Sequence, residues 1–144
     1  MSYFSVFDIS AAGMSVQKSR VDVVALNLAN SETTKTATGG AYKPLRVVVN
    51  EAIGQSIFAN LLTSELTNNR FYGSYVAEIR PIDDPLKLVH KPGHPEADDN
   101  GMVEYPNIDP VAEMVNLLEA TRAYEANVKA LNAGTVMAQA ALEI

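Results

Sequence analysis

Cysteine is missing from this 144-residue chain, and several features that would point to particular functions are missing with it. Without a thiol, the chain can form neither a disulfide nor a thiolate metal site, and it has no cysteine nucleophile. Positive charge is also scarce, because the net charge is −6 and residues 1–34, 35–107 and 108–144 are each net negative. Nucleic-acid binding requires a basic surface, so we expect no DNA or RNA partner, and the acid excess disfavours an anionic membrane surface.

Long apolar runs are missing as well. The longest uncharged stretches, such as residues 130–142, are shorter than the roughly 20 residues that span a bilayer, so no membrane span is expected. At the N-terminus, no Lys or Arg precedes Lys18, and Asp8 interrupts the first apolar stretch, which is not the pattern of a cleavable signal peptide. If the protein works outside the cytoplasm, we expect it to leave by another route.

What the chain does contain is helical periodicity at both ends. Residues 6–29 predict a first helix that ends near Asn30, and Asp109-Pro110 is a favourable start for a last helix that runs to Leu142. Each helix carries a lengthwise seam of apolar or small residues at 3–4 spacing, as in bundles and coiled coils. The seams are Phe7, Ser10, Met14, Gln17, Val21, Val24 and Leu28, then Met114, Leu117, Thr121, Tyr124, Val128, Leu131, Thr135, Ala138 and Leu142.

The two predicted helices differ in length, since a rise of 1.5 Å per residue gives roughly 36 Å for the first and roughly 50 Å for the last. Part of the last seam therefore stays uncovered, and we expect it to order against partners. Matching helices at the two termini favour a hairpin-like rod that stacks against copies of itself.

The middle of the chain has a different pattern. Strands are predicted at residues 45–49, 72–80, 86–90 and 102–105, with a turn at Gly39-Gly40 and a two-residue hairpin turn at Asn100-Gly101. Residues 51–66 are ambiguous between helix and loop. The fold class is therefore α+β, with long terminal helices and a small β-rich insertion.

One segment, residues 90–99, could carry chemistry. His90, His94 and Asp98 are suitable metal ligands, so a small metal-dependent hydrolase is one interpretation. Two prolines and a glycine prevent the helix that would place both histidines on one face, which favours a rigid loop whose His94 bonds locally to backbone. The chain contains no G-x-S-x-G elbow and no phosphate-binding glycine loop.

Two polar groups on the helices each allow two interpretations. Residues 120–127 combine small residues with Arg122, Tyr124, Glu125 and Asn127, which suits either a subunit interface or a solvated face with an Arg122–Glu125 pair. Asn27 and Asn30 close the first helix, either as caps or as contacts to a neighbouring subunit.

Three motifs together resemble the axial proteins of the bacterial flagellum, and among them the proximal rod proteins. They are Phe7-Asp8-Ile9-Ser10 with Gly13-Met14, Asn27-Leu28-Ala29-Asn30 and Thr33-Thr34; Pro92-Gly93-His94-Pro95 with Ala97-Asp98, Asn100-Gly101, Val103 and Pro106-Asn107; and Glu113-Met114 with residues 122–127. The second motif argues against another rod or hook subunit.

The resemblance implies a structural, non-enzymatic subunit with no cofactor and no small-molecule substrate. It implies export through the flagellar type III apparatus and helical assembly, with copies of itself and other rod proteins, into the periplasmic drive shaft that transmits torque and encloses the export channel. Basal-body ring components are further candidate neighbours. Residues 1–35 and 108–144 would form a coiled-coil inner domain, and residues 36–107 a small outer domain.

The same resemblance and the helical seams together predict the residues of the subunit interface. They are Phe7, Met14, Val21, Asn27, Leu28, Asn30, Thr33, His94, Pro95, Asn107, Met114, Leu117, Arg122, Tyr124, Glu125, Asn127 and Leu131.

Overall fold

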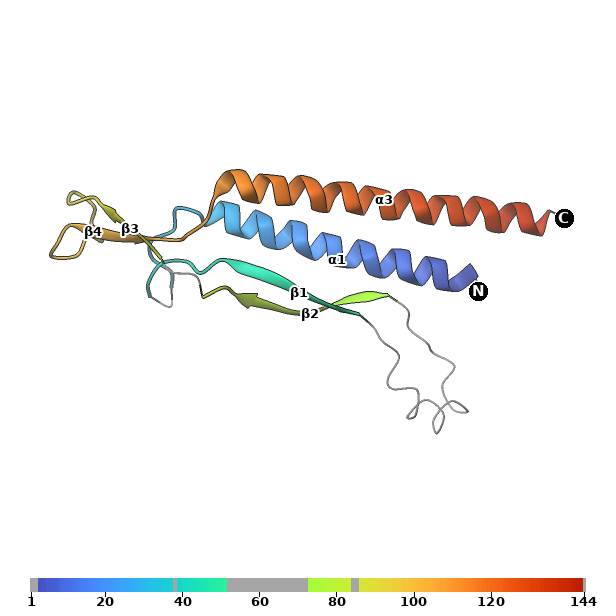
Figure 1. Cartoon of the computed structure of the whole chain (residues 1–144), viewed down its shortest axis with the longest axis horizontal. Coiled ribbons are helices and arrows are strands. Elements are labelled where there is room, and N and C mark those ends of the chain that lie inside the picture. Colours follow the sequence, from blue (N-terminus) through green and yellow to red (C-terminus); the bar gives the residue numbers. More distant parts are fainter. Residues whose placement is uncertain (1–2, 38, 52–72, 84–85, 144) are drawn as a thin grey trace, which may run out of the picture.

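The computed structural model describes residues 3–37, 39–51, 73–83 and 86–143, and it has an α+β architecture. Two long terminal helices lie side by side, and two small antiparallel sheets come between them in the sequence (Figure 1). The elements are α1 (Tyr3–Ala29), β1 (Leu45–Glu51), β2 (Ser74–Pro81), β3 (Lys87–His90), β4 (Met102–Tyr105) and α3 (Pro110–Leu142). No described helix is both long and apolar enough to cross a membrane.

Helices α1 and α3 run antiparallel, and one register holds along their whole length. Gly134 lies against Val6 and Phe7, at 3.7 and 3.8 Å from an added β-carbon. A β-carbon at Gly13 would lie only 2.9 Å from Nδ2 of Asn127, so the Asn127 side chain of α3 packs directly on this glycine. Near the far end, Asn27 of α1 bonds to Glu113 of α3. The helices thus form a hairpin whose two termini lie at the same end (Figure 1).

The ends of both helices follow the local sequence, as predicted. At the end of α1, the backbone N–H and the side-chain amide of Asn30 both donate to the carbonyl of Leu26, at 3.1 and 2.9 Å. At the start of α3, the carboxylate of Asp109 accepts a 2.9 Å hydrogen bond from the N–H of Val111, and Pro110 occupies the first helical position. Side chains of this kind satisfy groups that a helix end leaves without a partner.

The N-cap of α3 can be tested by Asp109→Ala. The variant leaves the Val111 N–H without its side-chain acceptor, so we expect the free energy of unfolding to fall by about 1 kcal/mol. Chemical denaturation followed by circular dichroism measures the change. Asp99→Ala removes the same charge from an exposed loop position and should have a smaller effect. Equal losses in the two variants would contradict a capping role for Asp109.

The first sheet pairs β1 with β2, from Leu45 opposite Pro81 to Glu51 opposite Ser74, with an irregularity between Val48 and Val49. Both strands contact α1. The second sheet pairs β3 with β4 in regular antiparallel register, and Val103 of β4 is almost fully buried at 1% exposure. The predicted strands are thus confirmed within the described residues. The ambiguous segment lies outside them except for Glu51, which ends β1.

The predicted turn at Asn100-Gly101 is wrong in its type. A two-residue hairpin turn of the predicted kind needs positive φ at both positions, but only Gly101 has it, at 71°. The N–H of Gly101 instead donates to the carbonyl of Asp98 at 2.7 Å, which makes a four-residue turn that ends on the glycine. A β-carbon there would lie 3.1 Å from Cβ of Pro92, so the packing also requires glycine. At Gly39-Gly40 the predicted turn is confirmed, with φ of 88° and 79°.

Candidate subunit interface

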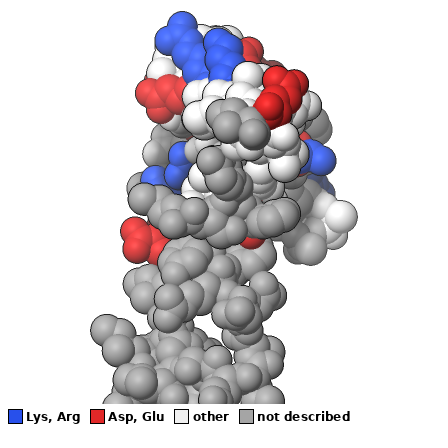
Figure 2. Space-filling model, turned by 90° about the vertical axis from the view of Figure 1, so that its right-hand side faces the viewer, with Lys and Arg blue, Asp and Glu red and all other residues white. Residues whose placement is uncertain are grey.

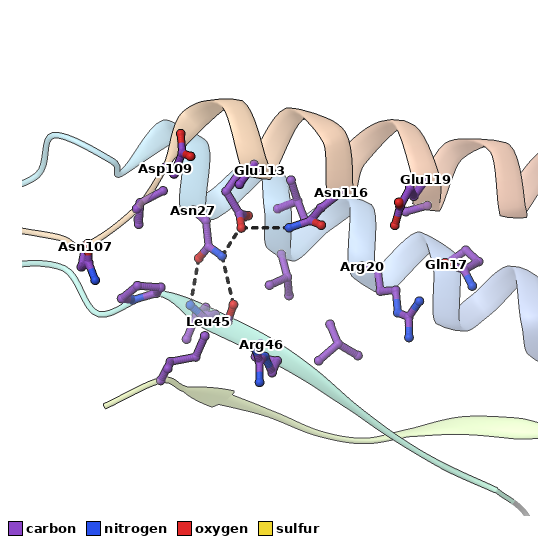
Figure 3. Close-up of a pocket in the computed structure, with 18 of the residues that line it drawn as sticks. Gln17, Arg20, Asn27, Leu45, Arg46, Asn107, Asp109, Glu113, Asn116 and Glu119 are labelled. Carbon is purple, nitrogen blue, oxygen red and sulfur yellow. Dashed lines mark hydrogen bonds between the residues drawn. The ribbon is translucent and has the colours of Figure 1, made fainter. Parts of the chain in front are cut away.

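Asn27 is the residue through which both helices and the first sheet meet. Its side chain is 3% exposed, yet all its hydrogen-bonding capacity is used. Nδ2 donates to the carbonyl of Leu45 at 3.0 Å and to Oε2 of Glu113 at 3.3 Å, while Oδ1 accepts from the N–H of Leu45 at 2.8 Å (Figure 3). Oδ1 also accepts from the Tyr42 hydroxyl at 3.1 Å. An amide can make two bonds of each kind, so Asn27 is fully satisfied.

The groups around Asn27 are themselves held in place. Oε1 of Glu113 accepts a 3.3 Å hydrogen bond from Asn116 on the next turn of α3. Burial raises the pKa of the Tyr42 hydroxyl above its ordinary value, and the negative charge of Glu113 raises that pKa further. The hydroxyl therefore stays neutral, and remains a donor to Asn27, well into the alkaline range. This network fixes the start of β1 against the helix pair.

Beside Asn27 lies an open groove of about 700 Å³ between the helix pair and β1, which we term the junction groove (Figure 3). Its walls combine small and aliphatic side chains with charged side chains of both signs. Its lining residues include Gln17, Arg20, Val23, Val24, Arg46, Asn107, Ala112, Glu113, Glu119, Ala120 and Ala123. Oε1 of Gln17 is buried and accepts no hydrogen bond from the described residues.

The predicted seam of α1 is largely covered within the chain. Ser10 and Val24 are buried, and the remaining five positions are half-buried, among them Phe7, Met14, Val21 and Leu28. Asn30 and Thr33 bond locally, with the Thr33 hydroxyl donating to Oδ1 of Asn30 at 3.2 Å. The structure thus gives the Asn30 side chain the capping role, and its contact to another subunit stays a prediction.

The predicted seam of α3 is half-buried at five of its nine positions and exposed at the other four. The half-buried positions are Leu117, Val128, Leu131, Thr135 and Ala138, and Asn127, predicted for the interface but not for the seam, is half-buried as well. The buried residues of α3 are Ala120 and Gly134, each one place before the predicted Thr121 and Thr135. Gly134 packs against Val6 and Phe7 of α1, where an added β-carbon would make only ordinary contact. Ala120, Asn127 and Gly134 follow one another at intervals of seven residues. This spacing is a signal in the sequence that the predicted apolar seam does not include.

The other predicted residues of α3 point away from the chain. Met114 is 47% and Tyr124 40% exposed, and Arg122 and Glu125 are exposed as well. The alternative Arg122–Glu125 ion pair does not form, because the one ion pair among the described residues joins Lys43 to Asp83. These four side chains remain available to a neighbouring molecule.

Local contacts hold the loop that contains both histidines. Nδ1 of His94 accepts a 3.3 Å hydrogen bond from the N–H of Glu96, as predicted, and its ring meets Tyr105 edge-on at 6.4 Å between centroids. The carboxylate of Glu96 accepts a hydrogen bond from the hydroxyl of Thr34, which ties this loop to the segment after α1. Pro95 is exposed, and so is Asn107, at the end of the junction groove (Figure 3).

The structure gives no support to the hydrolase interpretation. His90 and Asp98 are exposed, and no three His, Asp or Glu side chains within the described part of the chain are placed to hold a metal ion. The nitrogen of His94 that faces its own loop is already used as an acceptor for backbone.

Comparison with known proteins also points to a structural protein. A sequence model of the family described as "Flagellar basal body rod FlgEFG protein C-terminal" matches residues 99–144. The "Flagellar basal-body rod protein FlgC" of Bacillus subtilis (strain 168) is 40% identical over 149 residues, which cover 100% of this chain and 99% of that protein. Its counterpart in Aquifex aeolicus (strain VF5) is 43% identical over 133 residues, covering 92% and 89%. That of Salmonella typhimurium (strain LT2) is 37% identical over 134 residues, covering 92% and 90%.

The chain is a helical hairpin with outward-facing apolar side chains, and its C-terminal part matches the rod family. Together these two findings place it in the class of structural proteins of the flagellar basal-body rod. Within that class the relatives align along nearly their whole length and agree with one another. The chain belongs to the FlgC family of flagellar basal-body rod proteins.

Proposed function

We propose that this chain assembles helically into the rod through the faces of α1 and α3 that their own pairing leaves uncovered. Residues 1–35 and 108–144 act as the inner domain and pack lengthwise as a coiled coil with neighbouring subunits. Residues 36–107 act as the outer domain, held against the inner one through Asn27. The rod is then a drive shaft that crosses the periplasm, transmits torque and encloses a channel.

The observation that carries this proposal is an apolar face on the first turns of α3, directed away from α1. Val111, Met114, Val115 and Leu118 follow one another at helical spacing and are 64%, 47%, 49% and 57% exposed. A run of large apolar side chains on one face of a helix is typical of a surface that is buried in an assembly. We term these four residues the outer face of α3.

The proposed partners are further copies of the chain, other rod proteins and, before assembly, the flagellar type III export apparatus. Ring components of the basal body are candidate outer neighbours. The role is mechanical and non-enzymatic, and it needs no cofactor. Met114, Arg122, Tyr124 and Glu125 contact neighbours directly, whereas Asn27 and Leu131 support the interface from within the chain.

The outer face is tested by Leu118→Glu in a strain that lacks the native gene. A charge on this face should block rod assembly and swimming, because burying an unpaired carboxylate between subunits is costly. Since Leu118 is already 57% exposed, the free energy of unfolding of the isolated variant should stay within about 0.5 kcal/mol of the wild type. Motility on soft agar and electron microscopy of purified basal bodies measure assembly.

Leu118→Met is the matched control, since it keeps an apolar side chain of similar size. It should swim and assemble normally. If Leu118→Glu also supported normal swimming and complete rods, the outer face of α3 would not be a subunit contact.

A further inference from the structure

The first sheet carries two arginines that face each other on adjacent strands. The register of β1 and β2 places Arg46 directly opposite Arg80, which puts both side chains on the same face of the sheet. Both residues are exposed, and neither forms an ion pair with another described residue. Like charges directly opposite each other are destabilising, so this arginine pair lowers the stability of the isolated sheet. Anionic groups that bind both guanidinium groups would offset that loss.

The arginine pair lines an open pocket of about 330 Å³ that carries little opposing charge of its own. The acid in the pocket wall, Asp83, is already paired with Lys43 at 3.1 Å. Glu78 lies on the same face of β2, but it does not line the pocket and pairs with no described cation. A guanidinium group binds a carboxylate through two parallel hydrogen bonds. The pocket is thus suited to carboxylates.

The acids of the junction groove form no ion pair with Arg46, although Arg46 also lines that groove. In the close-up, the Arg46 side chain lies at β1, away from α3, where Asp109, Glu113 and Glu119 lie (Figure 3). Asp109 and Glu113 already accept hydrogen bonds from the first turn of α3 and from two asparagines. The Arg46 guanidinium is therefore available to a group from outside the chain.

The loop between β3 and β4 offers carboxylates of this kind. Residues 96–104 include four acidic residues and no Lys, Arg or His. Asp98 and Asp99, which we term the acidic tip, are exposed on this loop at the end of the molecule opposite the two termini (Figure 1). The nearby Lys91 donates to the Tyr105 hydroxyl at 3.1 Å and forms no ion pair with the acidic tip. At the end that carries the termini, by contrast, charged side chains of both signs lie among uncharged ones (Figure 2).

We propose that the acidic tip of one copy of this chain binds the arginine pair of a second copy. The two surfaces carry opposite charge and belong to different sheets, and no described ion pair joins them within one chain. A contact between two different surfaces is head-to-tail, so it propagates from subunit to subunit and does not close into a two-fold dimer. Opposite charges also fix the register of neighbouring subunits. The proposal rests on the proposed role as a rod subunit and adds to it a contact between outer domains.

Charge reversal on each side tests this contact in a strain that lacks the native gene. Arg46→Glu/Arg80→Glu and Asp98→Arg/Asp99→Arg should each lower the number of complete rods per cell by about tenfold, because each variant places like charges across the interface. Combining the four substitutions restores opposite charges, so most of the loss should be recovered. Electron microscopy of purified basal bodies gives the count. The control Lys87→Glu reverses an exposed charge on β3 outside the pocket and should assemble normally.

Folding of the variants is checked separately from assembly. Circular dichroism of the isolated double variants should match the wild type, because the substituted side chains are exposed. If one of them did not fold, Arg80→Gln and Asp99→Asn remove a single charge from each side, and each should lower the rod count severalfold. Normal rod counts in the variants of either side, or no recovery in the combined variant, would overturn binding between two copies of this chain. The proposed function would still stand if Leu118→Glu blocked assembly.

Discussion

Replacing Asn27 with alanine is expected to lower the free energy of unfolding by about 3 kcal/mol. The variant removes four hydrogen bonds at once and leaves the backbone of Leu45, the Tyr42 hydroxyl and one oxygen of Glu113 without their partner. Each stranded group costs about 1–3 kcal/mol when it stays dry. Water from the adjacent junction groove can reach some of them, so the loss is smaller than the sum. Thermal unfolding should show a melting temperature roughly 10 °C lower.

Asn30→Ala is the matched control, because it removes the same amide from the next turn of the chain. Asn30 is only half-buried, and its side chain bonds to the carbonyl of Leu26 and the hydroxyl of Thr33, which water can replace. We expect a loss of about 1 kcal/mol or less. Equal losses for the two asparagines would mean that Asn27 does not hold the helices and the sheet together.

Asn27→Asp separates hydrogen bonding from size. The carboxylate keeps the oxygen that accepts from Leu45 and Tyr42, but it loses both donors and lies beside the carboxylate of Glu113. Like charges in such close contact repel, so this nearly isosteric variant should be at least as unstable as Asn27→Ala near neutral pH. Hydrogen exchange at the amide of Leu45 gives a local readout of the same network.

The helices and strands could be predicted from the sequence because their signals are local. Asp109-Pro110 carries its own capping chemistry, and the change from an apolar seam to polar residues after Ala29 marks the end of α1. The Leu-Arg-Val-Val-Val run at residues 45–49 likewise placed β1, and the alternation of apolar and polar residues placed β2. The α+β class follows from these elements alone.

The role of Asn27 could not be predicted, because its burial depends on a contact between distant segments. A polar residue near a helix end is usually a cap, and nothing near Asn27 in the sequence shows that Leu45 and Glu113 will meet it. The predicted seam of α3 missed the buried Ala120 and Gly134 for a different reason. A 3–4 pattern fixes the period of a helix but leaves its rotation open by one residue, and Ala120 adds little hydrophobicity although it lies at the contact.

The second large effect is expected at Gly13, where the side chain of Asn127 packs directly against α1. Gly13→Leu forces a branched side chain toward Asn127, whose Nδ2 lies 2.9 Å from where the β-carbon would be. Overpacking of this kind costs about 3 kcal/mol, and the better helix propensity of leucine offsets about 1 kcal/mol. We therefore expect a net loss of about 2 kcal/mol, measured by chemical denaturation, together with reduced rod assembly.

Two further variants show whether contact with Asn127 is the cause. Adding Asn127→Ala to Gly13→Leu makes room and should recover at least about 1 kcal/mol, measured as the coupling energy in a double-mutant cycle. Gly134→Ala is the control at the other helix glycine, where the nearest atom is Val6 Cγ1 at an ordinary 3.7 Å. That variant should be neutral or more stable by up to about 1 kcal/mol. If Gly13→Leu were also neutral, the helices would not meet in this register, and the junction groove would lose its structural basis.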